Sequence, residues 1–325
     1  MLTWLGQTKS QHYSILRIRK RNGSIRTLHN PDALIRGVQY RLLVFLLDKV
    51  IIPDYVYAFE KKKSIPTMAA IHTNKGIEAS IDLKDFFHSI TQTQVENILK
   101  TLGIGEKPAR TISELVTYKY FVPQGGLTSP KIANIITAQT FGPDVKQLCD
   151  RYNLTLSIYA DDITISTNRT DLEISKLLNE IYGIIIKHGF KVNHKKTKVM
   201  YNTQRQYVCG VVVNKKTNLI KRERYRLRAI VHNIVTNGLE TEAAKSNEEP
   251  EKFASIILGK VNWMKQLNPP LGDKLFTKLN TYLNNWRAAH PLHQIPTTET
   301  PKLDFTVISS EVGAKVSELP FDLEN

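Results

Sequence analysis

The sequence predicts an α+β fold, with a mixed region of helices and strands first and an all-helical region last. Alternating apolar and basic residues flank Asn22-Gly23, and Asn-Gly between such runs is a strong β-hairpin signal. A second hairpin is indicated by LTLSIYADDITIST, residues 154–167, where apolar residues flank a short acidic break. From Arg222 to Trp286 the apolar residues recur at helical spacing, which predicts the all-helical region.

The other elements follow from the same periodicities. The first hairpin, residues 13–31, is expected to carry its apolar residues on one face: Ile15, Ile18, Ile25 and Leu28. A strand is expected around residues 78–84, and Gly/Pro-rich residues 121–130 form a loop before an apolar helix. Short strands with basic flanks are expected in residues 191–201 and 207–220. Further helices are expected at residues 34–46, 91–102, 108–118 and 174–188.

Composition narrows the class of protein. The 325 residues are 41% hydrophobic and 23% charged, which is typical of a folded chain and excludes wholesale disorder. Cys149 and Cys209 are the only cysteines, so a disulfide scaffold and a zinc finger are excluded and a reducing cytoplasm is the expected location. The N-terminal residues lack the apolar core of a signal peptide, and no apolar run is long enough to span a bilayer, so we expect no membrane partner.

The charge balance points to a polyanionic partner. Forty-five Lys and Arg residues against 30 Asp and Glu residues leave a formal net charge of +15. An excess of this size is most often a footprint of nucleic acid binding.

Three carboxylates stand where apolar strand residues give way to a turn. Asp82 ends one predicted strand, and Asp161-Asp162 interrupt the second hairpin. A single aspartate at a strand end is most often a turn former. Two adjacent carboxylates repel each other, however, and a fold that keeps them together usually neutralises them with cations. If the Asp82 strand lies beside the hairpin, the three acids converge and a pair of Mg²⁺ ions could catalyse phosphoryl transfer there.

Several segments resemble the motifs of reverse transcriptases, in the order of that family. Tyr159-Ala160-Asp161-Asp162 resembles the YxDD motif, and residues 81–87 resemble motif A. Residues 122–130, VPQGGLTSP, resemble the QGxxxSP loop. Residues 189–197 resemble motif D, and Val208-Cys209-Gly210 with the following strand resembles the primer grip.

Within this family the chain resembles the retron type. Residues 64–72 lie where retron enzymes carry NAxxH, with Met68 in place of the asparagine. Val208-Cys209-Gly210 lies where they carry VTG, with cysteine in place of threonine. The resemblance implies a right-hand polymerase fold with fingers, palm and a mainly helical thumb. It places the fingers at residues 1–80 with a contribution from 100–140, the palm at 81–219, the thumb at 220–290 and a C-terminal tail at 291–325.

The resemblance also implies roles for individual residues. Asp82, Asp161 and Asp162, with the backbone carbonyl of Leu83, are expected to hold two Mg²⁺ ions, and Lys196 is the candidate general acid. The incoming dNTP is expected to contact Phe87, Gln124, Gly125, Lys20 and Arg26, with Phe87 as the steric gate against the 2′-hydroxyl. For the fingers cations Lys20 and Arg26 the alternative is a solvated basic face.

A wider set is expected to contact nucleic acid through charge or through the primer grip. It comprises Lys61, Lys62, Lys63, His72, Lys195, Lys198, Val208, Cys209, Gly210, Arg222, Arg224, Arg226 and Arg228. Without the resemblance, the histidine is more often a satisfied core residue, and the cysteine a small packed apolar residue.

The expected function is RNA-directed DNA polymerisation. By the retron resemblance, the enzyme copies a structured noncoding RNA into single-stranded DNA joined to that RNA (msDNA), in antiphage defence beside an effector protein. One alternative is another defence-associated reverse transcriptase. The other is an RNA-binding protein without polymerase activity, similar to a group II intron maturase.

Overall fold

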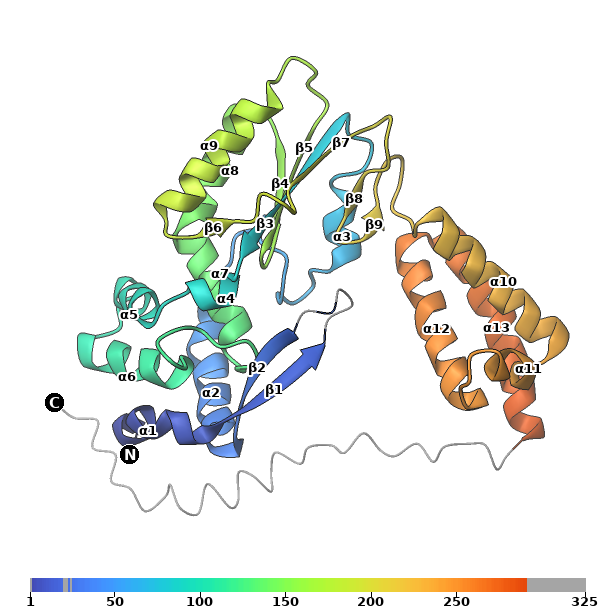
Figure 1. Ribbon diagram of the computed structural model, residues 1–325, viewed down its shortest axis with the longest axis horizontal. Helices are drawn as coiled ribbons and strands as arrows, with labels where there is room; N and C mark the ends of the chain where they lie inside the picture. The colour runs from blue at the N-terminus through green and yellow to red at the C-terminus, as the bar shows by residue number, and fades with distance from the viewer. Residues whose placement is uncertain (1, 20–22, 24, 291–325) are drawn as a thin grey trace. The chain divides into compact units, whose positions relative to one another are not determined.

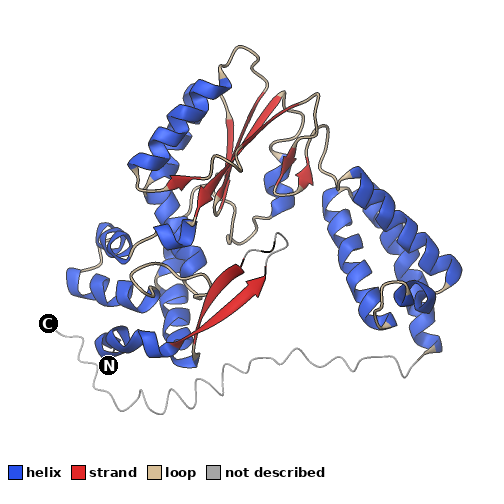
Figure 2. Cartoon of the chain, in the orientation of Figure 1, coloured by secondary structure: helices blue, strands red, loops and turns tan. Residues whose placement is uncertain are grey.

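The computed structural model describes residues 2–19, 23 and 25–290 (Figure 1). The described residues divide into two compact units, unit 1 and unit 2, with the boundary between Ile220 and Lys221. Unit 1 contains all the strands among the described residues, and the described part of unit 2 is helical (Figure 2). None of the helices found in the described ranges is long and apolar enough to cross a membrane.

Unit 1 mixes helices with nine strands. Its helices are α1 (Leu2–Thr8), α2 (Ala33–Phe45), α3 (Ile65–Ala70), α4 (Phe86–Ser89), α5 (Gln92–Thr101), α6 (Glu106–Val116), α7 (Ser129–Gln139), α8 (Phe141–Arg151) and α9 (Ile174–Lys187), with short 3₁₀ turns at Lys9–His12 and Leu47–Lys49. Its strands are β1 (Tyr13–Arg19), β2 (Ile25–Pro31), β3 (Ile77–Lys84), β4 (Thr155–Tyr159), β5 (Asp162–Thr167), β6 (Lys191–Val192), β7 (Lys198–Tyr201), β8 (Tyr207–Val208) and β9 (Val211–Val212).

The main sheet is antiparallel and is centred on β3. Strand β5 pairs with one edge of β3 and β4 continues the sheet beyond β5, so the predicted hairpin at residues 154–167 is confirmed. The other edge of β3 pairs with two short strands, β7 near its start and β6 at its end. The loop at residues 193–197 joins these two strands and therefore passes the edge of β3 beside Asp82.

Alternation along β3 separates an apolar face from a polar one. Ala79, Ile81 and Leu83 are buried in the main core together with apolar residues of α8 and α9. Glu78 and Asp82 lie on the opposite face, because successive side chains of a strand point to opposite sides. Burial of the apolar face against two helices thus fixes which face presents the acids.

The N-terminal ribbon is the antiparallel hairpin that the sequence predicts, with Arg19 opposite Ile25. The expectation of one apolar face is wrong. Ile15 and Ile18 are an odd number of residues apart and so point to opposite sides, and each is about half exposed, at 49% and 50%. The ribbon is held at its base instead, where Tyr13 packs into a small second core with Leu5, Ile35, Leu115 and Tyr118.

Unit 2 is a bundle of four helices (Figures 1 and 2). They are α10 (Lys221–Asn237), α11 (Leu239–Ala244), α12 (Pro250–Leu267) and α13 (Pro269–Ala289). The longest two, α12 and α13, form a hairpin at Asn268-Pro269-Pro270, where the prolines occupy the first turn of α13. Val231, Val261 and Leu279 are among the fully buried side chains between these helices. The predicted all-helical region is confirmed.

A strained turn in unit 1 yields a stability prediction. Tyr118 and Phe121 exchange both backbone hydrogen bonds across Lys119 and Tyr120, whose φ angles of 48° and 66° are those of a type I′ turn. Such turns favour Asn-Gly, and Tyr120 is 78% exposed, so little burial is lost on replacing it. Lys119→Asn with Tyr120→Gly is expected to raise the free energy of unfolding by about 1–2 kcal/mol in urea titration.

The control for this turn is Lys119→Ala, which keeps a Cβ in the left-handed conformation and should leave stability unimproved. A double variant that is no more stable than the wild type would contradict the prediction.

Candidate active site

The three acids meet at one end of the main sheet. Asp82 lies directly opposite Asp162 in the pairing of β3 with β5, and the next residue, Leu83, donates its backbone N–H to the Asp161 carbonyl at 2.8 Å. The convergence predicted from the sequence is therefore present. It follows from register, because β3 ends where the hairpin of β4 and β5 turns.

The hairpin tip is a two-residue turn that places Asp161 at its apex. Tyr159 pairs with Asp162, which leaves Ala160 and Asp161 as the turn residues. Ala160 is 7% exposed and has a φ of 55°, a left-handed conformation that costs an alanine about 1 kcal/mol. Strain of this kind persists where the surrounding structure fixes the backbone, and it often marks a functional site.

Burial and the neighbouring negative charges raise the pKa values of Asp161 and Asp162. Burial, together with the negative charges of Asp161 and Asp82, raises the pKa of Asp162 to about 6. The pKa of Asp161 is also raised, first by burial and then by Asp82, while the positive charges of Lys196 and Arg26 act in the opposite direction. A site with this electrostatic profile favours a bound cation.

Two residues of the loop at 193–197 hold Asp82. The Lys196 Nζ donates to Asp82 Oδ1 at 2.7 Å, and the Asn193 Nδ2 donates to Oδ2 at 3.0 Å. The Asn193 backbone N–H also donates to the Asp82 carbonyl at 2.8 Å. The hydrogen bond to Asp82 raises the pKa of Lys196, so its ammonium stays protonated beside the acids. Asn193 lies in the segment that resembles motif D, but its direct contact with Asp82 was not predicted.

The donor set fits hard divalent cations. Carboxylate oxygens are the ligands that Mg²⁺ prefers, and a cation would relieve the repulsion that raises the pKa values of Asp161 and Asp162. Within the part of the chain that the structure describes, no group of three or more ligands is already gathered in a binding arrangement. The Lys196 ammonium neutralises Asp82 in this arrangement, so cation binding would compete with that ion pair.

The residue pattern of the chain matches a known family. Residues 18–245 match the family described as reverse transcriptase (RNA-dependent DNA polymerase). The chain belongs to the reverse transcriptase family. The match includes all three acids and the Lys196 loop, so the site lies within the part of the chain that defines the family.

Its relatives are retron reverse transcriptases, which confirms the retron-type resemblance. The retron Mx65 reverse transcriptase of Myxococcus xanthus is 32% identical over 284 residues, which cover 82% of this chain and 64% of that protein. The retron Ec86 reverse transcriptase of Escherichia coli is 29% identical over 230 residues, 70% of this chain and 71% of that protein. The chain therefore spans less than two thirds of the Myxococcus relative.

Solved structures show the same fold at low identity. Telomerase from Candida albicans, in complex with a fragment of telomeric RNA, superposes with a TM-score of 0.50 at 10% identity, covering 98% of this chain and 68% of that one. Apo telomerase from Candida tropicalis gives 0.51 at 11% identity, covering 94% and 62%. The predicted α+β, right-hand polymerase fold is thus confirmed.

The described residues expected to contact the nucleotide differ in how the structure holds them. Phe86 is buried, whereas Phe87 is only partly buried and packs edge-on against it. The Gln124 carbonyl accepts the backbone N–H of His29 at 2.7 Å. A Cβ at Gly125, which has a φ of 114°, would lie 2.7 Å from the His29 carbonyl oxygen. The glycine therefore permits close approach to β2 of the ribbon.

Of the ribbon cations, Arg26 lies within electrostatic reach of the acids, since its positive charge opposes the rise in the pKa of Asp161. Lys20 lies outside the described residues.

Three residues expected to contact nucleic acid have structural roles instead. His72 is fully buried, and its two ring nitrogens hydrogen-bond Ser166 Oγ and Ser157 Oγ at 2.7 and 2.8 Å, so the expected RNA contact is wrong. The Lys63 ammonium donates to three backbone carbonyls of residues 53–56 and is not free for phosphate. The Val208 side chain is 1% exposed and can contribute only packing.

The remaining residues of the wider set lie at the surface or on the β8–β9 hairpin. Cys209 and Gly210 form its two-residue turn, with φ angles of 45° and 83°. The Cys209 thiol lies 3.9 Å from Asp162 Oδ2, and burial raises the thiol pKa to about 12. Lys198 donates to the Tyr207 hydroxyl at 3.0 Å. Six further residues of the set are exposed: Lys61, Lys62, Lys195, Arg222, Arg226 and Arg228; Arg224 is partly exposed.

Proposed function

We propose that this chain is an RNA-directed DNA polymerase that copies a structured noncoding RNA into single-stranded DNA within a retron. The observation that carries the proposal is the convergence of Asp82, Asp161 and Asp162 at one sheet end in a member of the reverse transcriptase family. A fold that had lost polymerase activity would have no physical reason to keep three mutually repelling carboxylates.

In the proposed reaction the 3′-hydroxyl oxygen of a primer bonds to the α-phosphorus of a dNTP, the hydroxyl proton passes to solvent water, and the bond to pyrophosphate breaks. Asp82, Asp161, Asp162 and the Leu83 carbonyl would hold two Mg²⁺ ions, which when bound stabilise negative charge on the attacking and leaving oxygens. Lys196, protonated beside Asp82, is positioned to give its proton to the departing pyrophosphate.

The triphosphate is proposed to lie toward the ribbon. Arg26 already acts on Asp161 electrostatically, and an incoming polyphosphate would offer it a stronger partner. Lys20 is proposed to act with it. Gln124 and Gly125, fixed against β2 by the His29 contact, would line the nucleotide on the same side.

Phe87 is proposed to exclude ribonucleotides by contact with the sugar. Phe87→Val removes most of the ring, so incorporation of rNTPs relative to dNTPs is expected to rise about tenfold or more. Single-nucleotide extension with paired dNTP and rNTP titrations measures the ratio. Phe86→Leu is the matched control, since Phe86 is a buried core residue and should leave the ratio unchanged. An unchanged ratio in Phe87→Val would contradict the assignment.

Template and primer are proposed to contact the exposed cations and the β8–β9 turn. These are Lys61, Lys62, Lys195, Lys198, Cys209, Gly210, Arg222, Arg224, Arg226 and Arg228. Contacts of this kind give salt-sensitive affinity rather than sequence preference. The similarity to retron reverse transcriptases supports a dedicated RNA template. An msDNA product, a defence effector as partner and a cytoplasmic location are part of the same proposal.

The test is to express the chain from its native locus, purify it, and digest the bound nucleic acid separately with RNase and DNase. Wild type is compared with Asp161→Asn. A short DNA joined to RNA, present only with wild type, is the expected result. Bound RNA without DNA in either sample would favour the RNA-binding alternative, and DNA without a dedicated RNA would favour another defence-associated reverse transcriptase.

A further inference from the structure

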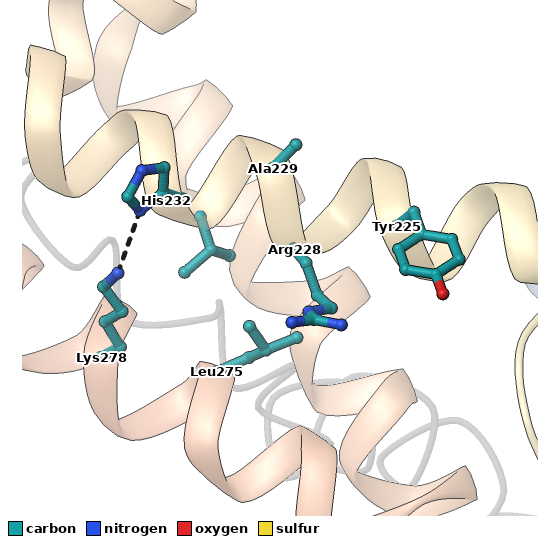
Figure 3. A pocket seen from close by; sticks show the side chains of 7 residues that line it. Tyr225, Arg228, Ala229, His232, Leu275 and Lys278 are labelled. Atoms are coloured by element: carbon teal, nitrogen blue, oxygen red, sulfur yellow. Dashed lines mark hydrogen bonds between the residues drawn. The ribbon is translucent and has the colours of Figure 1, made fainter.

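Unit 2 contains a hollow between α10 and α13 that the polymerase reaction does not use (Figure 3). Its volume is about 440 Å³. Tyr225, Ala229 and His232 follow one another along the same face of α10, at the spacing of successive helical turns. The hollow exists because the small Ala229 stands between two larger side chains. It is lined by Tyr225, Arg228, Ala229, Val231, His232, Leu275 and Lys278.

The hollow forms a groove between α10 and α13, and the polar groups that line this groove are cationic or neutral. Arg228 and Lys278 form no ion pair with any carboxylate among residues 2–19, 23 and 25–290, and both reach the groove, one from each helix (Figure 3). Lys278 Nζ lies 3.4 Å from His232 Nδ1, and an ammonium can only donate, so this ring nitrogen is the acceptor. An anion entering the groove would therefore meet two cations and no competing acid.

The tyrosine makes the rim suitable for an aromatic ring. Tyr225 is 50% exposed, and the cationic groups of Lys221, Arg224 and Arg228 lie 5.6–5.9 Å from its ring centroid. Cations at this distance interact with the ring face and gather positive charge around it. The floor beneath is apolar, since it is formed by Val231, Leu275 and the Ala229 methyl group.

These features together select one ligand chemistry. A planar, partly apolar group stacks on tyrosine and rests on the floor, while an attached phosphate is held by the two cations. A nucleotide has both parts, and a hollow of about 440 Å³ is within the usual range for a small ligand. Bases inside a double helix are stacked and paired, so only an unpaired nucleotide can enter.

We propose that the groove between α10 and α13 binds one unpaired nucleotide of the RNA partner. The base packs on Tyr225 and the apolar floor, and the phosphate is held by Arg228 and Lys278. This contact would let the protein distinguish structured RNA with a bulge or loop from plain duplex, which surface cations alone cannot do. The proposal rests on the proposed function only for the identity of the partner as RNA.

The experiment measures binding by fluorescence anisotropy, with full-length protein and no dNTPs. The probes are a blunt RNA duplex and the same duplex with one bulged adenosine at its centre. Wild type is expected to bind the bulged probe about tenfold more tightly, the value of one stacked base. Ala229→Leu places a larger side chain inside the hollow, removes no charge and keeps a good helix former, and it should abolish the preference. Ala288→Leu, at an exposed alanine of α13 outside the groove, should retain it.

Equal affinity of wild type for the two probes would overturn the proposal, and so would a preference retained by Ala229→Leu. If Ala229→Leu lowers the melting temperature, Tyr225→Leu decides instead, because it keeps an apolar side chain on an exposed position and removes the stacking face. No DNA synthesis occurs in this assay. If the protein discriminates the probes but extends no primer in a separate assay with dNTPs, the proposed function is overturned, whereas nucleotide binding in the groove is supported.

Discussion

Asp82→Asn is expected to lower dNTP incorporation at least about a thousandfold, equivalent to roughly 4 kcal/mol of transition-state stabilisation. Asp82 lies opposite Asp162 and is the residue that the Lys196 and Asn193 side chains hold in place. Asparagine keeps the shape but removes the charge that would bind a cation. We propose that Asp162 is the lesser of the three acidic ligands, so Asp162→Asn is expected to cost less, about ten- to a hundredfold.

Asp85→Asn is the matched control for this ranking. Asp85 follows Asp82 by three residues, is exposed and has a φ of 50°, a conformation that asparagine adopts readily. Primer extension on an RNA template under single-turnover conditions measures all three variants. Substantial activity in Asp82→Asn, or an Asp85→Asn variant as impaired as Asp82→Asn, would contradict the assignment. Asn193→Ala tests the second contact, through a smaller loss that excess divalent cation should not restore.

The convergence of the acids was predictable because it depends on local patterns. The alternation around Asp161-Asp162 predicts a hairpin, and the strand that ends at Asp82 needs only to pair with it in register. Burial of Ala79, Ile81 and Leu83 on the other face disfavours a second arrangement, since a slip by one residue would turn Asp82 into the apolar core.

The residues that sequence reasoning misplaced are those whose partners lie far away in the chain. The buried His72 ring is hydrogen-bonded by the hydroxyl groups of Ser157 and Ser166, which lie 85 and 94 residues further along the chain. Gln39 of α2 is likewise fully buried, because Tyr13 and Leu115 accept its amide hydrogens. No local period predicts such pairings, since a polar residue becomes a core residue only where tertiary contacts satisfy it.

Glu78 is the most unusual of these buried polar residues. It lies on β3 on the same face as Asp82, opposite Ser166 and Met200, and its side chain is fully buried. Both carboxyl oxygens lack a hydrogen-bond partner among the described residues. Burial raises the pKa of Glu78 to about 7. Of the other titratable groups on this face, His72 is kept neutral by burial, and the Cys209 thiol has its pKa raised in part by Glu78.

The raised pKa makes folding depend on pH in a definite direction. Since the ordinary pKa of a glutamate is 4.5, the folded state binds more protons than the unfolded state between that value and about 7. The contribution of Glu78 to the free energy of unfolding is therefore expected to be most favourable below pH 4.5. This contribution falls as the pH rises to about 7. The full loss is about 3 kcal/mol and persists at higher pH.

Glu78→Gln removes this penalty and should be more stable than the wild type by about 3 kcal/mol near pH 9, with the difference vanishing near pH 4. Urea unfolding at the two pH values measures it. Glu223→Gln, at an exposed glutamate of α10, is the control and should differ from the wild type by less than about 0.5 kcal/mol at both pH values. Equal stability of Glu78→Gln and wild type near pH 9 would mean that the folded protein satisfies the Glu78 charge, for example through an ordered water. A measured gain would show that β3 keeps a buried acid without a compensating partner. Selection for stability alone would remove such a cost.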